Sequence, residues 1–403
     1  MEAREQRGLE IAATKKLTRK GDLWLVPSQA GAGTYVVDPT EARTTCTCPD
    51  FEERAEPCKH VYAVEFTVRR ETTNADGSKV TEQLRLTYRQ EWPAYNAAQV
   101  HEKDRVAALL HDLCGAIDNP VQGRGRPRLP LADSVFCAAM KVYGGASGRR
   151  AMTDLREYAA KGYIDRAPHY NSVFNAFENP DLTPILSRMI EESAVPLKVF
   201  ETEFAADSSG FTTSLYHRWF SAKYGREMAA AKWIKAHIMV GTRTNVVTAA
   251  TITHGFEHDG QHFSPLLERT AQRFTLKRVS ADKAYSSARI LAQIESVGAQ
   301  PLVPFKKNAT GTAPYNKRGR DTWARAFHYF SYHREEFLAH YHQRSNVETT
   351  FHMIKSKFGT RLRSKTPIAQ VNELLCKILC HNLCCLVQAF YELGVEAEFW
   401  KAS

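Results

Sequence analysis

Short apolar runs separated by polar turns fill the first 95 residues, a pattern typical of short β-strands. The runs at 22–26 and 34–37 predict two strands, and the residues on both sides of 74–78 predict a hairpin with a glycine-bearing turn. Apolar positions then recur at helical spacing from 94 to 118. The predicted apolar face of this helix consists of Val106, Leu109, Leu110 and Leu113.

A glycine- and proline-rich linker over 121–130 separates this helix from short amphipathic segments over 131–195. Turn signals at Gly144-Gly145 and Asn179-Pro180 divide these segments, so we expect a small helical domain. Such a domain could contain a helix-turn-helix, although no turn signature establishes one.

From Leu197 onward, patterns of strands and helices alternate, which predicts an α/β or α+β layer domain. Ser264-Pro265 suggests a helix start, with His254, His258 and His262 in the preceding loop, and the last helices break near Gly359 and Pro367. Strands are expected near 198–206, 234–242, 245–253, 276–281 and 300–305, with helices from about 265 and 287 and over 333–393.

These patterns give a five-part organisation. We expect a β-rich metal-binding module, a helix with a basic linker, a helical domain that could bind DNA, an α/β core and a tail. Their predicted boundaries are 1–95, 96–130, 131–195, 196–393 and 394–403.

The 403-residue chain carries a net charge of +10, which favours a polyanionic partner such as nucleic acid over an acidic small molecule. A basic but indifferent surface is the alternative. No apolar run approaches the roughly 20 residues that span a bilayer, and Met1–Glu5 lacks a signal-peptide core. Nine cysteines, an odd number, favour thiols or metal ligands over a disulfide framework. We therefore expect an intracellular protein without a membrane partner.

Four potential metal ligands cluster near the N-terminus with the spacing C-x-C-x9-C-x-H. Cys46, Cys48, Cys58 and His60 are the ligand types that Zn²⁺ binds tetrahedrally, so we expect one structural Zn²⁺. The cluster resembles a SWIM zinc finger, a resemblance that implies DNA or protein binding. Three further cysteines, Cys376, Cys380 and Cys384, recur at helical spacing and are expected to pack in a helix interface.

Three carboxylates stand out in the predicted core. Asp207 and Asp282 each follow an apolar run, where a strand should end, and Glu348 lies on a predicted helix. Carboxylates on rigid elements can hold hard cations such as Mg²⁺. A predicted single helix face carries Tyr341, Arg344, Glu348 and Lys355.

The residues from Tyr341 to Lys355 match the Y-(2)-R-(3)-E-(6)-K signature and therefore resemble the DDE transposases of prokaryotic insertion sequences. Asp-Ser-Ser at 207 and Asp-Lys-Ala-Tyr at 282 resemble that family's aspartate contexts. The resemblance covers about 130–390. It implies an RNase H-like core in which Asp207, Asp282 and Glu348 coordinate two Mg²⁺ ions, with Tyr341, Arg344 and Lys355 at the DNA.

One departure from the family concerns the spacing of the carboxylates. Some relatives carry a large β-rich insertion before the glutamate, whereas 65 residues separate Asp282 from Glu348 here. Any insertion must be small, and the segment from Lys306 to Arg320 is expected to form a basic loop. Cleavage that relies on an inserted domain is therefore in doubt.

The resemblance implies a transposase that binds the terminal inverted repeats of its element, cleaves DNA and transfers the strand, acting as a homo-oligomer in the cytoplasm at the nucleoid. Arg124 and Arg126 match the core of an AT-hook, although a basic interdomain linker is the stronger interpretation. The alternatives are a non-catalytic DNA-binding protein descended from a transposase and an unrelated α/β hydrolase with structural carboxylates.

Overall fold

The computed structural model describes residues 92–400 apart from 123, 126, 127, 214–232 and 314–318. Within the first 91 residues it describes 4, 7, 8, 11, 12, 15, 17–20, 23–28, 33–39, 44–54, 56–67, 70–73 and 79–82. The chain divides into two compact units, Met1–Gln90 and Glu91–Ser403.

The first unit contains an antiparallel sheet with the strand order β1-β2-β3-β4, so the predicted strands are confirmed. Helix α3 packs on this sheet, and Val26, Val37 and Val61 form part of a small core. The predicted hairpin is also confirmed, because β5 and β6 pair from Thr73↔Lys79 outward, whereas its turn lies outside the described residues. The elements are β1 Thr18–Lys20, β2 Leu23–Pro27, β3 Thr34–Asp38, β4 Thr45–Cys46, α2 Pro49–Arg54, α3 Lys59–Thr67, β5 Arg70–Thr73 and β6 Lys79–Glu82.

The second unit is built on a five-stranded mixed sheet with the order β11-β10-β7-β8-β9. Strands β7, β8 and β9 are antiparallel neighbours, whereas β10 pairs in parallel with both β7 and β11. The predicted fold class, a mixed α/β core with flanking helices, is therefore confirmed. The strands are β7 Glu203–Thr212, β8 Trp233–Gly241, β9 Val247–His254, β10 Arg278–Ala281 and β11 Gln300–Leu302.

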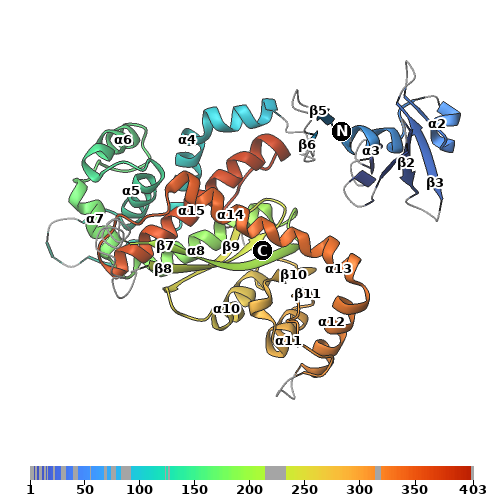
Figure 1. Cartoon of the computed structure of the whole chain (residues 1–403). Coiled ribbons are helices and arrows are strands. Elements are labelled where there is room, and N and C mark those ends of the chain that lie inside the picture. Colours follow the sequence, from blue (N-terminus) through green and yellow to red (C-terminus); the bar gives the residue numbers. More distant parts are fainter. Residues whose placement is uncertain are drawn as a thin grey trace. The chain divides into compact units, whose positions relative to one another are not determined.

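Helices cover both faces of this sheet (Figure 1). Helices α8 and α15 pack on β9 from one side, and α10 packs on β8 and β9 from the other. The helices are α4 Trp92–Cys114, α5 Leu131–Tyr143, α6 Gly148–Ala160, α7 Tyr170–Glu178, α8 Leu182–Ala194, α10 Asp259–Ala271, α11 Ala288–Ser296, α12 Arg320–Tyr332, α13 Arg334–Tyr341, α14 Ser345–Phe358 and α15 Pro367–Leu393, with short 3-10 turns η1 Val195–Leu197, η2 Lys283–Tyr285 and η3 His342–Arg344.

The long helix α15 lies at the centre of the second unit. It packs on α4, α5, α7 and α8 as well as on β8 and β9, so the helical segment over 131–195 shares one core with the sheet. By length and composition α15 could cross a membrane, but 78% of its apolar window is buried inside the protein. Of the three cysteines predicted to pack in a helix interface, Cys376 and Cys380 are fully buried, whereas Cys384 is partly buried.

A buried amide joins α15 to its neighbours. The Asn382 side chain accepts a hydrogen bond from the Val247 backbone N–H (2.8 Å) and donates to the carbonyls of Val247 (2.7 Å) and Ile190 (3.1 Å). It also donates to Ser193 Oγ (3.0 Å), so one side chain connects α15, α8 and the start of β9. Sequence patterns cannot reveal this connection, because the three elements are far apart along the chain.

We expect Asn382→Leu to destabilise the second unit by about 3 kcal/mol, because it leaves several buried polar groups without partners. Thermal denaturation of the purified variant measures this change. Gln388→Leu, on the partly exposed end of the same helix, is the control and should unfold close to the wild-type temperature. Equal melting temperatures for the two variants would contradict the structural role of Asn382.

The start of α10 differs from the prediction. The helix begins at Asp259 with His258 at its N-cap, and therefore includes His262, which was predicted to lie in a loop. The Asp259 carboxylate pairs with Lys235 and lies 3.5 Å from His237 Nδ1, both on β8. Contacts with the sheet thus fix the start of the helix, while the Ser264 hydroxyl donates to Gln293 (2.8 Å) instead of capping.

Candidate active site and zinc centre

Strand register brings the two aspartates together at one level of the central sheet. The last parallel pair between β7 and β10 is Ala206↔Ala281, so Asp207 is the next residue of β7 and Asp282 is the first residue after β10. Neighbouring strands lie roughly 4.8 Å apart. Asp282 accepts a hydrogen bond from the Lys283 N–H (2.6 Å) at the start of η2, so it follows a strand end as predicted.

Asp207 does not end its strand, contrary to the prediction. Strand β7 continues to Thr212, because it pairs with β8 without interruption as far as Thr212↔Trp233. Pairing with the parallel partner, β10, ends at this level, whereas the residues of β7 from Asp207 onward continue to pair with β8. Asp207 is therefore held within β7 by its pairing with Ile238 of β8, one residue beyond the last pair with β10.

The Arg344 guanidinium links the first aspartate to the glutamate. Its Nη2 lies 3.2 Å from Asp207 Oδ2, and its Nη1 lies 2.7 Å from Glu348 Oε1. The Arg344 and Asp207 side chains are largely buried, at 16% and 21% exposure, whereas Glu348 is 60% exposed. The fork of the guanidinium thus connects the carboxylate of Glu348 on α14 to the carboxylate of Asp207 on β7.

Electrostatics support a shared location for the three carboxylates. Burial raises the pKa of Asp207, and the charges of Asp282 and Glu348 raise it further. The hydrogen bond from the Ser208 N–H and the charge of Arg344 lower this pKa, but by less. Burial also raises the pKa of Tyr341, and the same three carboxylates add to this shift. The oxygen donors and their mutual repulsion fit a hard divalent cation, which would relieve the repulsion.

The segment that carries Tyr341, Arg344, Glu348 and Lys355 is not one α-helix, contrary to the prediction. Helix α13 ends at Tyr341, the 3-10 turn η3 follows, and α14 begins at Ser345. The turn after β8 fixes this break: Asn346 Nδ2 donates to the Thr242 carbonyl (2.5 Å), and Thr242 Oγ1 donates to Gln343 (3.1 Å). Arg344 therefore occupies the N-cap position of α14.

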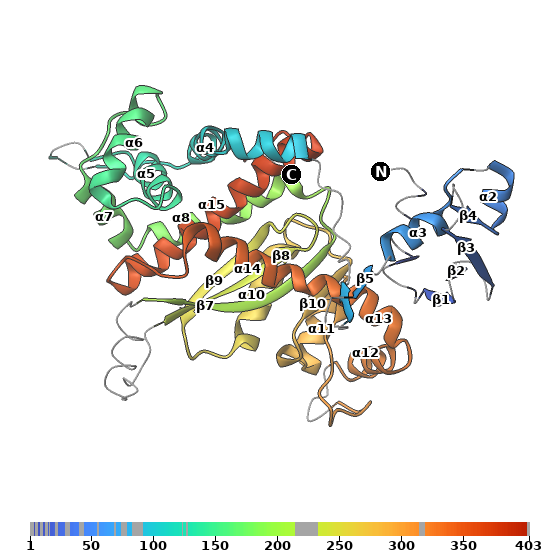
Figure 2. The same ribbon diagram turned by 45° about the horizontal axis from the view of Figure 1, so that its top comes forward.

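Helix α14 lies along β7, as Figures 1 and 2 both show. The Lys355 ammonium donates to Ser209 Oγ (2.6 Å) and lies 5.1 Å from the ring centroid of Phe211. Burial lowers the pKa of Lys355. Ser209 was not singled out from the sequence, although its position two residues after Asp207 places it on the same face of the strand.

The four predicted zinc ligands come together in the first unit. One ligand atom from each of Cys46, Cys48, Cys58 and His60 lies within 4.8 Å of the others, and all four residues are buried. His60 Nδ1 lies 3.9 Å from Cys46 Sγ and 3.8 Å from Cys58 Sγ. A tetrahedral site with Zn–S bonds of roughly 2.3 Å and Zn–N bonds of roughly 2.0 Å requires N···S separations of roughly 3.6 Å, close to those observed, so the cluster fits Zn²⁺.

Local structure explains how these ligands meet. Strand β4 carries Cys46, and the turn into α2 carries Cys48, whose carbonyl accepts from the N–H groups of Phe51 and Glu52 at 3.0 Å each. Cys58 and His60 lie at the start of α3, where the Tyr62 N–H donates to the Cys58 carbonyl (3.1 Å). Two adjacent helix starts thus complete the ligand set.

The structure describes only part of the predicted linker, which spans 121–130. Arg124 is exposed in a segment without regular structure, which agrees with a linker. Arg126 lies outside the described residues. The structure therefore does not place the two arginines of the AT-hook-like motif relative to each other.

The fold and these two sites define a two-part protein. A buried Cys₃His centre accompanies an α/β unit in which Asp207 and Asp282 follow the same strand pair and Arg344 joins Asp207 to Glu348. Family comparisons agree with both parts. Residues 35–68 match the model of the SWIM zinc finger, and residues 199–383 match the model of the transposase DDE domain. The chain therefore carries a SWIM zinc finger and a DDE transposase domain.

Proposed function

We propose that this protein is an active transposase that binds the terminal inverted repeats of an insertion sequence and catalyses metal-dependent cleavage and strand transfer of DNA. The observation that carries the proposal is the placement of Asp207 and Asp282 one residue beyond the same strand pair, with Glu348 drawn to Asp207 through Arg344. The matching transposase domain supports this chemistry.

Asp207, Asp282 and Glu348 would hold two Mg²⁺ ions, which supply stabilisation of negative charge on the attacking and leaving oxygens of a phosphodiester. Arg344 sets the position of Glu348, and the uninterrupted pairing of β7 with β8 sets the position of Asp207. The basic residues that follow on α14 favour a bound phosphate backbone near the carboxylates.

The zinc finger and the helical segment would contact DNA or a partner subunit. Two element ends must be held together during transfer, so we propose a homo-oligomer on double-stranded DNA. Its place of action would be the cytoplasm, at the nucleoid of a prokaryotic cell. One structural Zn²⁺ in the finger and two catalytic Mg²⁺ complete the proposed cofactors.

A nicking assay tests this proposal against the non-catalytic alternative. Duplex DNA taken from the sequence flanking the gene is incubated with the full chain and Mg²⁺ or Mn²⁺. We expect a divalent-metal-dependent nick at the element end. Binding of this DNA without any cut in either metal would favour a domesticated DNA-binding protein.

Lys355 is expected to grip DNA as well as to brace α14, and two variants separate these roles. Lys355→Met removes the charge and the hydrogen bond, whereas Ser209→Ala removes only the partner of the hydrogen bond. We expect Lys355→Met to weaken DNA binding about 5-fold. The salt slope, which is the slope of the logarithm of the binding constant against the logarithm of the salt concentration, should decrease in magnitude by roughly one, while Ser209→Ala binds like wild type. Fluorescence anisotropy at several salt concentrations measures both.

Thermal melting provides the complementary measurement for the same pair. A lysine that only braces the helix would give equal losses of melting temperature in both variants and unchanged DNA affinity. That result would remove Lys355 from the proposed DNA-binding surface.

A further inference from the structure

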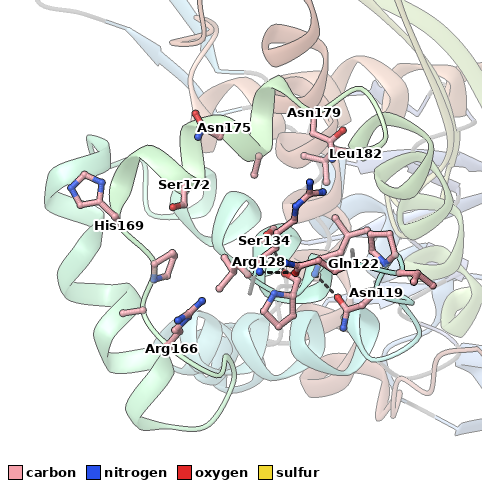
Figure 3. Close-up of a pocket in the computed structure, with 18 residues that line it drawn as sticks. Asn119, Gln122, Arg128, Ser134, Arg166, His169, Ser172, Asn175, Asn179 and Leu182 are labelled. Carbon is pink, nitrogen blue, oxygen red and sulfur yellow. Dashed lines mark hydrogen bonds between the residues drawn. The ribbon is translucent and has the colours of Figure 1, made fainter. Parts of the chain in front are cut away.

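A cleft of about 1040 Å³, lined by both polar and apolar residues, lies in the second unit, and none of the three carboxylates lines it. Figure 3 shows His169, Ser172 and Asn175 of the α7 region on one side, and Asn119, Gln122 and Arg128 on the other. The wall opposite α7 is the segment that links α4 to α5. We call this feature the linker cleft.

The lining of the linker cleft has the chemistry of a surface for an anionic, hydrogen-bonding ligand. None of its described lining residues is Asp or Glu, whereas Arg128, Arg166 and His169 contribute basic groups. Besides nine apolar residues, the remaining lining consists of side-chain amides and hydroxyls. These polar residues are Asn119, Gln122, Ser134, Ser172, Asn175 and Asn179.

Hydrogen bonds across the linker hold its wall in place. The Leu131 N–H donates to Asn119 Oδ1 (2.6 Å), and the Arg128 N–H donates to Gln122 Oε1 (2.9 Å), as the dashed lines in Figure 3 mark. These bonds use the amide oxygen of Asn119 and leave its N–H groups to donate elsewhere. Arg128 itself bonds through its backbone, and its residue is exposed.

Helix α7 presents a suitable face to the cleft. Ser172 and Asn175 on α7 and Asn179 at its C-cap follow the spacing i, i+3 and i+7. This spacing places the three residues on one side of the helix. The opposite side buries Val173 and Phe177 in the core, so the polar face is rigidly supported. A supported helix face of short amides and hydroxyls suits contacts with base edges, and Asn can pair with adenine through two hydrogen bonds.

We propose that the linker cleft binds the DNA of the element end, with Arg128 and Arg166 at phosphates and Ser172 and Asn175 at base edges. This inference rests on the proposed function and assigns the step that selects the element end to a site remote from cleavage. DNA fits better than an acidic peptide, because the lining combines separated cations with amides that can distinguish bases.

Two fluorescent duplexes test the proposal with the full chain, in a buffer without divalent metal. One is made from the DNA that flanks the gene, and the other is a shuffled duplex of the same composition. We expect Arg128→Ala to weaken binding of both about 5-fold and to lower the salt slope by roughly one. Asn175→Ala should weaken only the flanking duplex, by about 5- to 100-fold.

Arg156→Ala is the matched control, because Arg156 is exposed on α6 and does not line the cleft. Melting temperatures confirm that all variants fold, and Ser172→Ala replaces Asn175→Ala if the latter does not. Wild-type affinity of the cleft variants for both duplexes would overturn the proposal, as would equal losses in the control. If the cleft variants lose binding as expected while wild type never cuts, the cleft stands and the proposed catalysis fails.

Discussion

Asp207→Asn is expected to abolish DNA cleavage, with a loss on the order of 1000-fold or more, while the protein stays folded. The substitution removes a negative charge from the site where three carboxylates are proposed to hold metal. The Asn oxygen can still accept the hydrogen bond from Arg344 that Asp207 Oδ2 receives at 3.2 Å. The nicking assay with Mg²⁺ measures the effect, and DNA binding should remain.

The same variant has a predicted effect on stability. Burial and two neighbouring carboxylates raise the pKa of Asp207 above its usual 3.8, so the folded state binds this proton more tightly than the unfolded state. The proton on Asp207 therefore stabilises the folded state at low pH. This stabilisation is lost as the pH rises from 3.8, the usual pKa of the group, through its raised pKa in the folded state. At neutral pH, Asp207→Asn should therefore melt at or above the wild-type temperature.

Asp321→Asn is the matched control, because Asp321 is exposed at the start of α12. It should cleave like wild type and show no comparable pH-dependent difference in melting. Cleavage by folded Asp207→Asn at the wild-type rate would remove Asp207 from the catalytic set. A variant that melts well below wild type at neutral pH would contradict the electrostatic argument.

The second large effect is expected in the zinc centre. Cys58→Ser should lose about one equivalent of zinc and unfold the first unit, because a structural zinc site contributes about 10 kcal/mol or more to folding. The core of this unit is small, and three of its buried apolar positions are the cysteines themselves. Elemental analysis gives the zinc content, and limited proteolysis reports which unit has opened.

Cys384→Ser provides the comparison, since Cys384 lies on α15 in the other unit and is only partly buried. We expect it to retain zinc and a protease-resistant first unit. If wild type purified without chelator holds no zinc, or if Cys58→Ser leaves the first unit resistant, the zinc assignment fails.

Local patterns in the sequence were sufficient for much of this structure. The ligand spacing located Cys46, Cys48, Cys58 and His60, because a tetrahedral ion needs its donors close together in a short loop. The periodicity of apolar residues located the strands of the mixed sheet and the long helix α15. The apolar run before Asp282 located its strand end, because β10 pairs no further.

Features set by contacts between distant elements were not predictable. The extension of β7 past Asp207 depends on pairing with β8, and the break at η3 depends on the bonds from Thr242. The early start of α10 depends on Asp259 meeting β8. Helix α12 was missed because it follows a segment read as a basic loop, although its Trp323 packs on Phe305 (ring centroids 4.8 Å apart).

The central position of α15 has a consequence for the order in which the protein is made. Helices α4, α5, α7 and α8 and strands β8 and β9 pack against α15, which follows every strand and every carboxylate of the site in the chain. During synthesis these earlier elements therefore emerge from the ribosome without their main packing partner. The second unit can therefore complete its core only after α15 has been translated.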